Sequence, residues 1–257
     1  LAVFGAPILS ENHITDAIAA AIRMQNEMET VNTYCREHEY PLLEMGIGIH
    51  SGDAFIGNVG SEKMMRYNVI GKVVNECSRI ESYSVGGQVL VSEEALEGIE
   101  VPIEIHSKMQ ITAKGIHKPV SVCEVTAIGG EYGCGIENVK FDAVVPVKEK
   151  LILQLFRIEE KLVTAKAVLA VLEQFSLKRA VVSLSEENDS GSAEKSQLEI
   201  YSDVAITAIR EDGEMIFDGV YAKIVDVQQN RLVLHFTHVN HDFRQFAKMA
   251  VPQNVEN

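Results

Sequence analysis

Gly46-Ile47-Gly48-Ile49-His50-Ser51-Gly52 lies in the first half of the chain and alternates apolar residues with glycine and polar residues. Together with the residues before it, this period of two predicts a strand over 43–50. Glycine within a strand is typical of a place where another backbone or a ligand comes close, because no side chain stands in the way. Ser51-Gly52-Asp53 then predicts a turn, after which 54–59 returns as a second strand.

Further helices and strands are predicted on both sides of this hairpin. Residues 17–31 place Ala, Ile and Met at helical spacing, which predicts a helix with one buried stripe. A second helix is expected over 73–83, and Gly86-Gly87 supplies the residues that end it. The other elements expected in this half are a strand at 1–4, a short strand or turn at 68–70, a strand at 88–92, a short helix that starts at Ser92 and strands over 103–125 around a turn at Lys114-Gly115.

The second half of the chain is predicted to be mainly β. A domain boundary is placed near Asn138, just after a glycine-rich stretch at 129–135. Residues 161–175 are ambiguous, because their Ala and Leu residues favour a helix by propensity. The polar, serine-rich segment 186–196 predicts a mobile loop. Strands are expected over 151–156, 180–184, 199–209, 220–227 and 232–236.

Composition and charge narrow the classes of function. A chain of 257 residues has about the length of two domains, and 46% hydrophobic with 23% charged residues is ordinary for a soluble globular protein. The net charge of -14 argues against a nucleic-acid partner, which needs a basic face, whereas a nucleotide needs only a local basic pocket or a metal. Four scattered cysteines, no signal peptide and no apolar run of membrane-spanning length predict a cytoplasmic protein without a membrane segment.

An ordered series of short motifs follows the glycine-containing strand. The series comprises Ile56-Gly57-Asn58-Val59-Gly60-Ser61, Arg66-Tyr67-Asn68-Val69-Ile70-Gly71-Lys72-Val73-Val74-Asn75, Ser78-Arg79-Ile80-Glu81, Gly86-Gly87-Gln88-Val89-Leu90 and Ala113-Lys114-Gly115. In this order and with these gaps it resembles the catalytic domain of the class III adenylate/guanylate cyclases. The resemblance implies an α+β sandwich, with a mainly antiparallel sheet and helices in ferredoxin-like order. It assigns residues 1–138 to a cyclase domain that lacks its first strands.

The resemblance implies a nucleotidyl cyclase of intracellular signalling. In this reaction the ribose 3′-hydroxyl of ATP, or less favourably of GTP, attacks the α-phosphate and gives the 3′,5′-cyclic nucleotide and pyrophosphate. Because charge develops on the phosphate oxygens, positioned cations and hydrogen-bond donors carry the catalysis. Asn75 and Arg79 are four residues apart on a predicted helix and share one face. By resemblance, Asn75 orients the ribose and Arg79, which is always charged, contacts the α-phosphate in the transition state.

Substrate-binding positions are also implied by the resemblance. Lys114 matches the lysine that binds the terminal phosphates, and Asn68 occupies the position that recognises the base. Asp or Thr is more usual at that position, and Asn both donates and accepts hydrogen bonds, so the choice between ATP and GTP stays open. Gly57 and Asn58 complete the predicted substrate-binding set.

Each of these residues also has a purely structural interpretation. Asn75 could be a surface residue of its helix, and Arg79 could pair with Glu76 or Glu81. Lys114 before glycine could simply belong to a turn.

The metal ligands are expected outside this chain. The family's two metal-binding aspartates and its adenine-reading lysine fall upstream of Leu1, and Asp16 and Asp53 lie in the wrong motifs to replace them. The resemblance therefore implies Mg²⁺ or Mn²⁺ held by residues that precede this chain, which is expected to be inactive by itself. It also implies a homodimer, because one protomer supplies the aspartates and the other supplies the asparagine and the arginine. The alternative is a catalytically inactive cyclase-like module for dimerisation or regulation.

Residues 139–257 resemble a PilZ-like β-barrel, which is expected to be regulatory. The resemblance rests on 175–182, 221–225 and 235–237. That family binds cyclic dimeric GMP through an Arg-x-x-x-Arg segment and an Asp-x-Ser-x-x-Gly turn. Here 174–179 reads Gln-Phe-Ser-Leu-Lys-Arg, no Arg-x-x-x-Arg precedes it, and an arginine fills the space that glycine would leave for the ligand. A degenerate barrel that does not bind cyclic dimeric GMP well is expected, which disfavours a third class, a pure ligand-binding protein.

Overall fold

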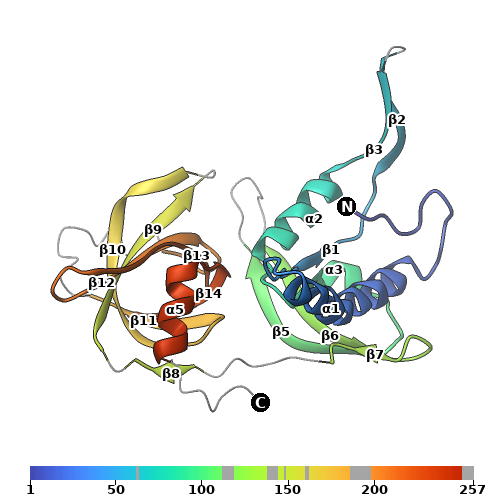
Figure 1. Cartoon of the computed structure of the whole chain (residues 1–257). Helices are drawn as coiled ribbons and strands as arrows, with labels where there is room; N and C mark the ends of the chain where they lie inside the picture. The colour runs from blue at the N-terminus through green and yellow to red at the C-terminus, as the bar shows by residue number, and fades with distance from the viewer. Residues whose placement is uncertain are drawn as a thin grey trace. The chain divides into compact units, whose positions relative to one another are not determined.

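The computed structural model describes residues 1–61, 64–111, 119–137, 144–147, 149–159, 162–185 and 198–250. The chain divides into two compact units, Leu1–Val139 and Lys140–Asn257, and each is described by itself (Figure 1). The loop predicted at 186–196 and the turn predicted at Lys114-Gly115 lie outside the described residues. None of the described helices is long and apolar enough to cross a membrane.

A mixed sheet of five described strands forms the centre of the first unit. β1 and β4 are parallel, and β6 is antiparallel to its neighbours on both sides. β4 is central and buried at all four positions, as expected of a strand with covered faces. The order is β1 (Ile47–Ile49), β4 (Val89–Ser92), β6 (Val120–Ile128) and β5 (Ile103–Ile111), and β7 (Cys134–Gly135) pairs with β6.

Helices cover both faces of this sheet. α1 (His13–Glu37) packs Ile18 and Ile22 against Val89 in one core cluster. α2 (Lys72–Tyr83) packs Ile80 against Leu90 in another. Because successive residues of a strand point to opposite faces, α1 and α2 lie on opposite sides of β4. The short helix α3 (Glu93–Leu96) begins at Ser92, whose side chain accepts a hydrogen bond from the backbone of Ala95, as the sequence predicted.

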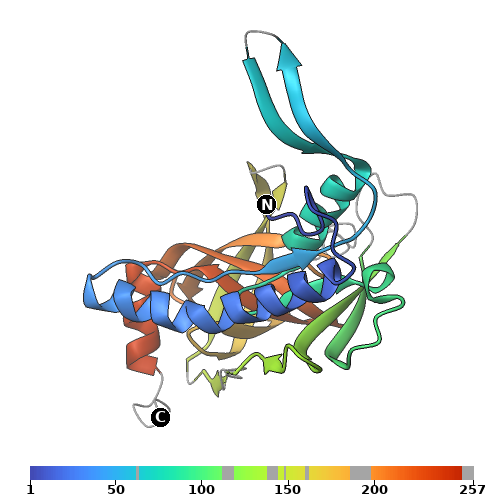
Figure 2. The ribbon, with the colours of Figure 1, turned by 90° about the vertical axis from the view of Figure 1, so that its right-hand side faces the viewer.

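β2 (Phe55–Ser61) and β3 (Met64–Ile70) form an antiparallel hairpin that pairs with no other described strand. It projects away from the rest of the first unit in both ribbon views (Figures 1 and 2). Its residues Phe55, Met64, Met65 and Tyr67 are each more than 60% exposed. A lone hairpin is marginally stable in water, and exposed apolar residues of this size mark an interaction surface.

Three predictions for the first unit are wrong in detail. Residues 1–4 form no strand, because they pair with none of the described strands, and Leu1 is 90% exposed. The strand predicted over 43–50 is confined to Ile47–Ile49, where β4 supplies its hydrogen-bonding partner. The helix expected over 17–31 is longer at both ends, His13–Glu37.

The second unit is mainly β, and its longest strands pair in a circle. Each of six strands is antiparallel to the next, in the order β9, β10, β11, β14, β13, β12 and back to β9. The interior holds one core cluster. The elements are β8 (Val145–Pro146), β9 (Leu151–Glu159), β10 (Leu162–Phe175), β11 (Arg179–Leu184), β12 (Asp203–Arg210), β13 (Met215–Gln228), β14 (Arg231–His238) and α5 (His241–Ala250).

The ambiguous segment 161–175 contains a strand rather than a helix. Val168, Ala170 and Leu172 are buried at alternate positions of β10, which is the period of a strand. Neighbours on both sides, β9 and β11, satisfy the backbone of β10, and this pairing outweighs the helical propensity of its Ala and Leu residues.

Helix α5 adds aromatic side chains to the same core. Phe243 packs edge-on against Phe217 and Phe236, and Phe246 lies 5.1 Å from Phe175 between ring centroids. The likeness of this unit to PilZ domains stays a prediction.

Candidate active site on helix α2

Helix α2 is held against β1 through two glycines. A Cβ atom on Gly48 would lie 2.4 Å from the backbone nitrogen of Glu81, and one on Gly46 would lie 2.0 Å from Ser84 Oγ. Cys77 Sγ donates a hydrogen bond to the carbonyl oxygen of Gly48 at 3.4 Å, and burial raises the pKa of this thiol. One face of α2 is therefore pressed onto the strand, and its orientation about its own axis is set by these contacts.

Asn75 and Arg79 lie on the other side of α2. Residues of a helix follow one another at about 100°, so these two side chains are neighbours and point away from the face that carries Cys77. Asn75 is exposed and Arg79 is half-buried. No described residue forms an ion pair with Arg79. The structural interpretation of Arg79 required an ion pair with Glu76 or Glu81, and the described residues contain neither pair.

Glu76 instead contacts a lysine of its own helix and a histidine that follows β1. Lys72 Nζ lies 2.7 Å from its Oε1, and His50 Nε2 lies 3.5 Å from its Oε2. His50 Nδ1 is in turn 2.8 Å from Ser92 Oγ. The hydrogen bond from Lys72 is the largest cause, with His50 a smaller one, that holds the pKa of Glu76 below its usual value.

Sequence reasoning missed this group of side chains. His50 and Ser92 are 42 residues apart, so nothing in their local sequence links them. The signal lies in the sheet: β1 and β4 are parallel with Ile49 opposite Val91, which brings the next residues of the two strands side by side.

Three of the predicted substrate-binding residues lie on the β2–β3 hairpin: Asn68, the predicted base-recognition residue, with Gly57 and Asn58. Gly57 is the cross-strand partner of Asn68, and Asn58 is the partner of Tyr67. Asn58 and Asn68 are exposed, and Asn68 Oδ1 accepts a hydrogen bond from the backbone of Val69 at 2.9 Å. The structure thus brings Gly57 and Asn68 together. Among the described side chains, no recorded contact joins them to the helix α2.

Lys114, the predicted phosphate-binding residue, lies outside the described residues. Within the described ranges, no cluster of three or more His, Cys, Asp or Glu side chains could hold a metal ion. Asp16 accepts hydrogen bonds from Tyr132 Oη at 2.8 Å and from Ser10 Oγ at 3.4 Å, which is a structural role beside the start of α1. The residues that are described therefore do not fit a resident Mg²⁺ or Mn²⁺.

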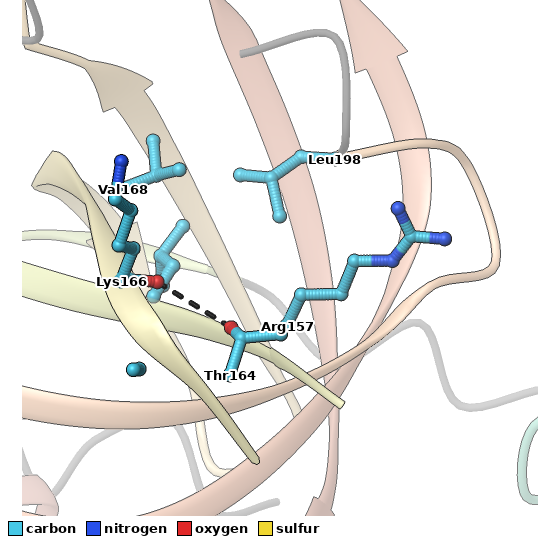
Figure 3. A pocket seen from close by; sticks show the side chains of 7 residues that line it. Arg157, Thr164, Lys166, Val168 and Leu198 are labelled. Atoms are coloured by element: carbon cyan, nitrogen blue, oxygen red, sulfur yellow. Dashed lines mark hydrogen bonds between the residues drawn. The ribbon is translucent and has the colours of Figure 1, made fainter. Parts of the chain in front are cut away.

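The second unit contains a small cavity of about 170 Å³ (Figure 3). Thr164 Oγ1 donates to the carbonyl oxygen of Lys166 at its rim. This volume is below the roughly 300–1,000 Å³ of ordinary ligand pockets. The cavity is too small for a dinucleotide. Its lining consists of Leu155, Arg157, Thr164, Ala165, Lys166, Val168 and Leu198.

Comparison with known proteins concerns the first half of the chain. The family model described as "Adenylate and Guanylate cyclase catalytic domain" matches residues 1–130. The chain is 26% identical over 129 residues to adenylate cyclase 1 of Rhizobium meliloti, a match that covers 49% of this chain and 19% of that protein. It is 30% identical over 120 residues to the adenylate cyclase of Anabaena cylindrica, a match that covers 43% of this chain and 24% of that protein. The chain thus spans a quarter or less of the length of these curated relatives.

A solved structure shares the fold of this half. The guanylyl cyclase Cya2 superimposes with a TM-score of 0.50 at 35% sequence identity, over 52% of this chain and 68% of that chain. The superposition supports a mixed α+β architecture for the unit that contains α2, Asn75 and Arg79.

Proposed function

Because the chain belongs to the adenylate and guanylate cyclase catalytic domain family, we propose that it is part of a longer nucleotidyl cyclase, the parent protein, which makes a 3′,5′-cyclic nucleotide and pyrophosphate from ATP or, less favourably, GTP. The observation that carries this proposal is the arrangement of α2. Its buried face is fixed on β1, and its outer face presents Asn75 and an Arg79 that no described acid pairs with. An unpaired guanidinium beside a hydrogen-bonding amide suits a sugar phosphate.

In the proposed reaction this chain supplies donors rather than a nucleophile. The 3′-hydroxyl of the substrate loses its proton to solvent, its oxygen forms a bond to the α-phosphorus of the same nucleotide, and the bond from that phosphorus to the leaving pyrophosphate breaks. Arg79 stabilises the charge that develops on the α-phosphate oxygens, and Asn75 orients the ribose by hydrogen bonds. Lys114 is proposed to contact the terminal phosphates and Asn68 to recognise the base, while Gly57 and Asn58 are proposed to belong to the substrate-binding surface.

The metal belongs to a part of the site that we place upstream of Leu1. The described residues offer no metal-binding group, so no step of the reaction is derived through the ion here. Mg²⁺ or Mn²⁺ is proposed to be held by residues of the parent protein that precede this chain. A second protomer would bring those ligands to Asn75 and Arg79, and the exposed apolar residues of the β2–β3 hairpin support association with a second copy.

An assay of the purified parent protein with Mn²⁺ and either ATP or GTP tests this proposal. Arg79→Ala is expected to lower kcat by about 10²–10³, as removal of a transition-state donor does, with a smaller change in KM. Arg79→Lys should recover little, because an ammonium lacks the forked donors. A soluble dimeric parent protein that forms neither cyclic nucleotide would refute the proposal and would favour the second candidate, an inactive cyclase-like module, which the lack of a metal-binding group among the described residues supports.

For residues 140–257 we propose a regulatory, degenerate PilZ-like domain. A side chain of the turn between β10 and β11 stabilises that turn. Ser176 Oγ accepts hydrogen bonds from the backbone nitrogens of Lys178 and Arg179. Ser176 is buried, so this hydroxyl serves the turn rather than a ligand. Calorimetry with cyclic dimeric GMP is expected to show no tight binding, and tight binding would overturn the assignment.

A further inference from the structure

Glu76 occupies a position from which it could disable Arg79. The two residues are three apart on α2, and a carboxylate and a guanidinium at that spacing are neighbours on the helix surface. A Glu76–Arg79 pair would cover part of the guanidinium and place a negative charge beside any phosphate that approaches it. The described structure contains no such pair, although both side chains belong to the same helix turn.

Both carboxylate oxygens of Glu76 are engaged by residues other than Arg79. Oε1 contacts Lys72 and Oε2 contacts His50. The two contacts differ in environment, since the side chain of Lys72 is 86% exposed and that of His50 is 6% exposed. An exposed lysine four residues away on the same helix is a weak and salt-screened partner. The buried histidine, which comes from the sheet, is therefore the partner that fixes where the carboxylate lies.

His50 is itself oriented by the neighbouring strand. Ser92 Oγ accepts the backbone N–H of Ala95 at 3.3 Å and lies 2.8 Å from His50 Nδ1. When Ser92 donates to Nδ1, the neutral imidazole carries its hydrogen on Nε2, the nitrogen that lies 3.5 Å from Glu76 Oε2. The end of β4, the end of β1 and α2 are thus joined by three successive side chains.

We propose that His50 is a positioning residue that retains the Glu76 carboxylate on the sheet side of α2 and so keeps Arg79 open to the phosphate of the substrate. The proposal rests on the proposed function, because it assigns the open guanidinium to substrate. It gives His50 no contact with the nucleotide. It also predicts that the harm done by losing His50 depends on the presence of Glu76, which a role in packing alone would not produce.

Paired substitutions in the parent protein separate these roles. His50→Leu keeps the bulk of the side chain and removes the donor, whereas His50→Gln keeps an N–H near the position of Nε2. His50→Leu is expected to lower kcat about fivefold, between the roughly twofold effect of an exposed helical pair and the 10²-fold effect of losing a transition-state donor. His50→Gln should retain at least half of the wild-type kcat.

The decisive variant combines His50→Leu with Glu76→Ala. Removal of the carboxylate is expected to restore kcat to within about twofold of Glu76→Ala alone, a coupling that a double-mutant cycle measures. A double variant as slow as His50→Leu would overturn the proposal, because the loss would then come from packing. Equal kcat for His50→Leu and wild type would overturn it as well.

A second readout does not depend on activity. In a crystal structure of this chain with His50→Leu, Glu76 is expected within ion-pair distance of Arg79. A carboxylate that stays with Lys72 and away from Arg79 would contradict the proposal. If the wild-type parent protein makes no cyclic nucleotide, the proposed function fails, and this structure still decides whether His50 directs Glu76.

Discussion

At the scale of single residues, the chemistry of α2 depends on which carboxylate meets which cation. Glu76 has three basic residues within reach along or beside its helix, and it contacts Lys72 and His50 rather than Arg79. The spacing of Asn75 and Arg79 could be predicted from the sequence, because helical periodicity alone puts them on one face. The partner of Glu76 could not be predicted from the sequence, because it depends on a histidine that a separate strand brings to the helix.

Glu76 also makes stability depend on pH in a defined direction. Its pKa in the folded chain lies below the value of about 4.3 expected of an unfolded glutamate. Its contribution to the free energy of unfolding is therefore complete above that value and is lost as the pH falls through the folded pKa. In urea titrations, the stability difference between wild type and Glu76→Gln should be larger at pH 7 than at pH 3. A difference that grows on acidification would contradict this assignment.

At the scale of elements, Gly48 in β1 determines how closely α2 approaches. The sequence predicted that the glycines at 46 and 48 mark a close approach, and the structure identifies the neighbours as the backbone of α2 for Gly48 and Ser84, just after the helix, for Gly46. The helix was also predicted nearly to its ends, 73–83 against Lys72–Tyr83. Propensity alone did not decide between helix and strand for residues 161–175. Their conformation depends on β9 and β11, the strands that pair with β10 in the folded ring.

Gly48→Ala is expected to displace α2. The added Cβ would meet the backbone nitrogen of Glu81 at 2.4 Å, and a backbone cannot move aside as a side-chain tip can. A loss of roughly 1–3 kcal/mol in the free energy of unfolding is expected, as for other overpacked sites. Gly52→Ala is the matched control, because its Cβ would meet only the side chain of Val73, at 3.2 Å from a methyl group and 3.4 Å from Cβ, and no backbone atom within 4 Å.

Denaturant unfolding of both variants measures this difference. Gly48→Ala should be the less stable of the two, and it should also lose cyclase activity in the parent protein, because Asn75 and Arg79 move with the helix. Equal stability of the two variants would show that α2 does not depend on this contact.

At the scale of the whole molecule, the β2–β3 hairpin pairs with no other described strand of the first unit. The sequence predicted its first strand and only a short strand or turn at 68–70 for its second, and it did not predict that so much apolar surface would be exposed on it. We expect Met65→Glu to weaken self-association of the parent protein, because it places a charge among Met64, Tyr67 and their neighbours.

Sedimentation over a range of concentrations measures this effect. Met215→Glu is the control, since Met215 is about as exposed, at 60% against 63% for Met65, but lies in the second unit. If both variants associate as wild type does, the hairpin is not the surface that holds two copies together.

The central claim is that Asn75 and Arg79 of this chain complete an active site whose metal ligands come from another protomer. A cyclase assay on mixed proteins tests it most directly: this chain is combined with a full-length parent protein that carries Arg79→Ala, in the presence of ATP and Mn²⁺. The account predicts that cyclic AMP forms at least tenfold faster in the mixture than with the Arg79→Ala parent protein alone, which keeps only the residual rate of that variant, and that this chain alone forms none. No product from a demonstrated mixed dimer, beside an active wild-type control, would contradict the claim.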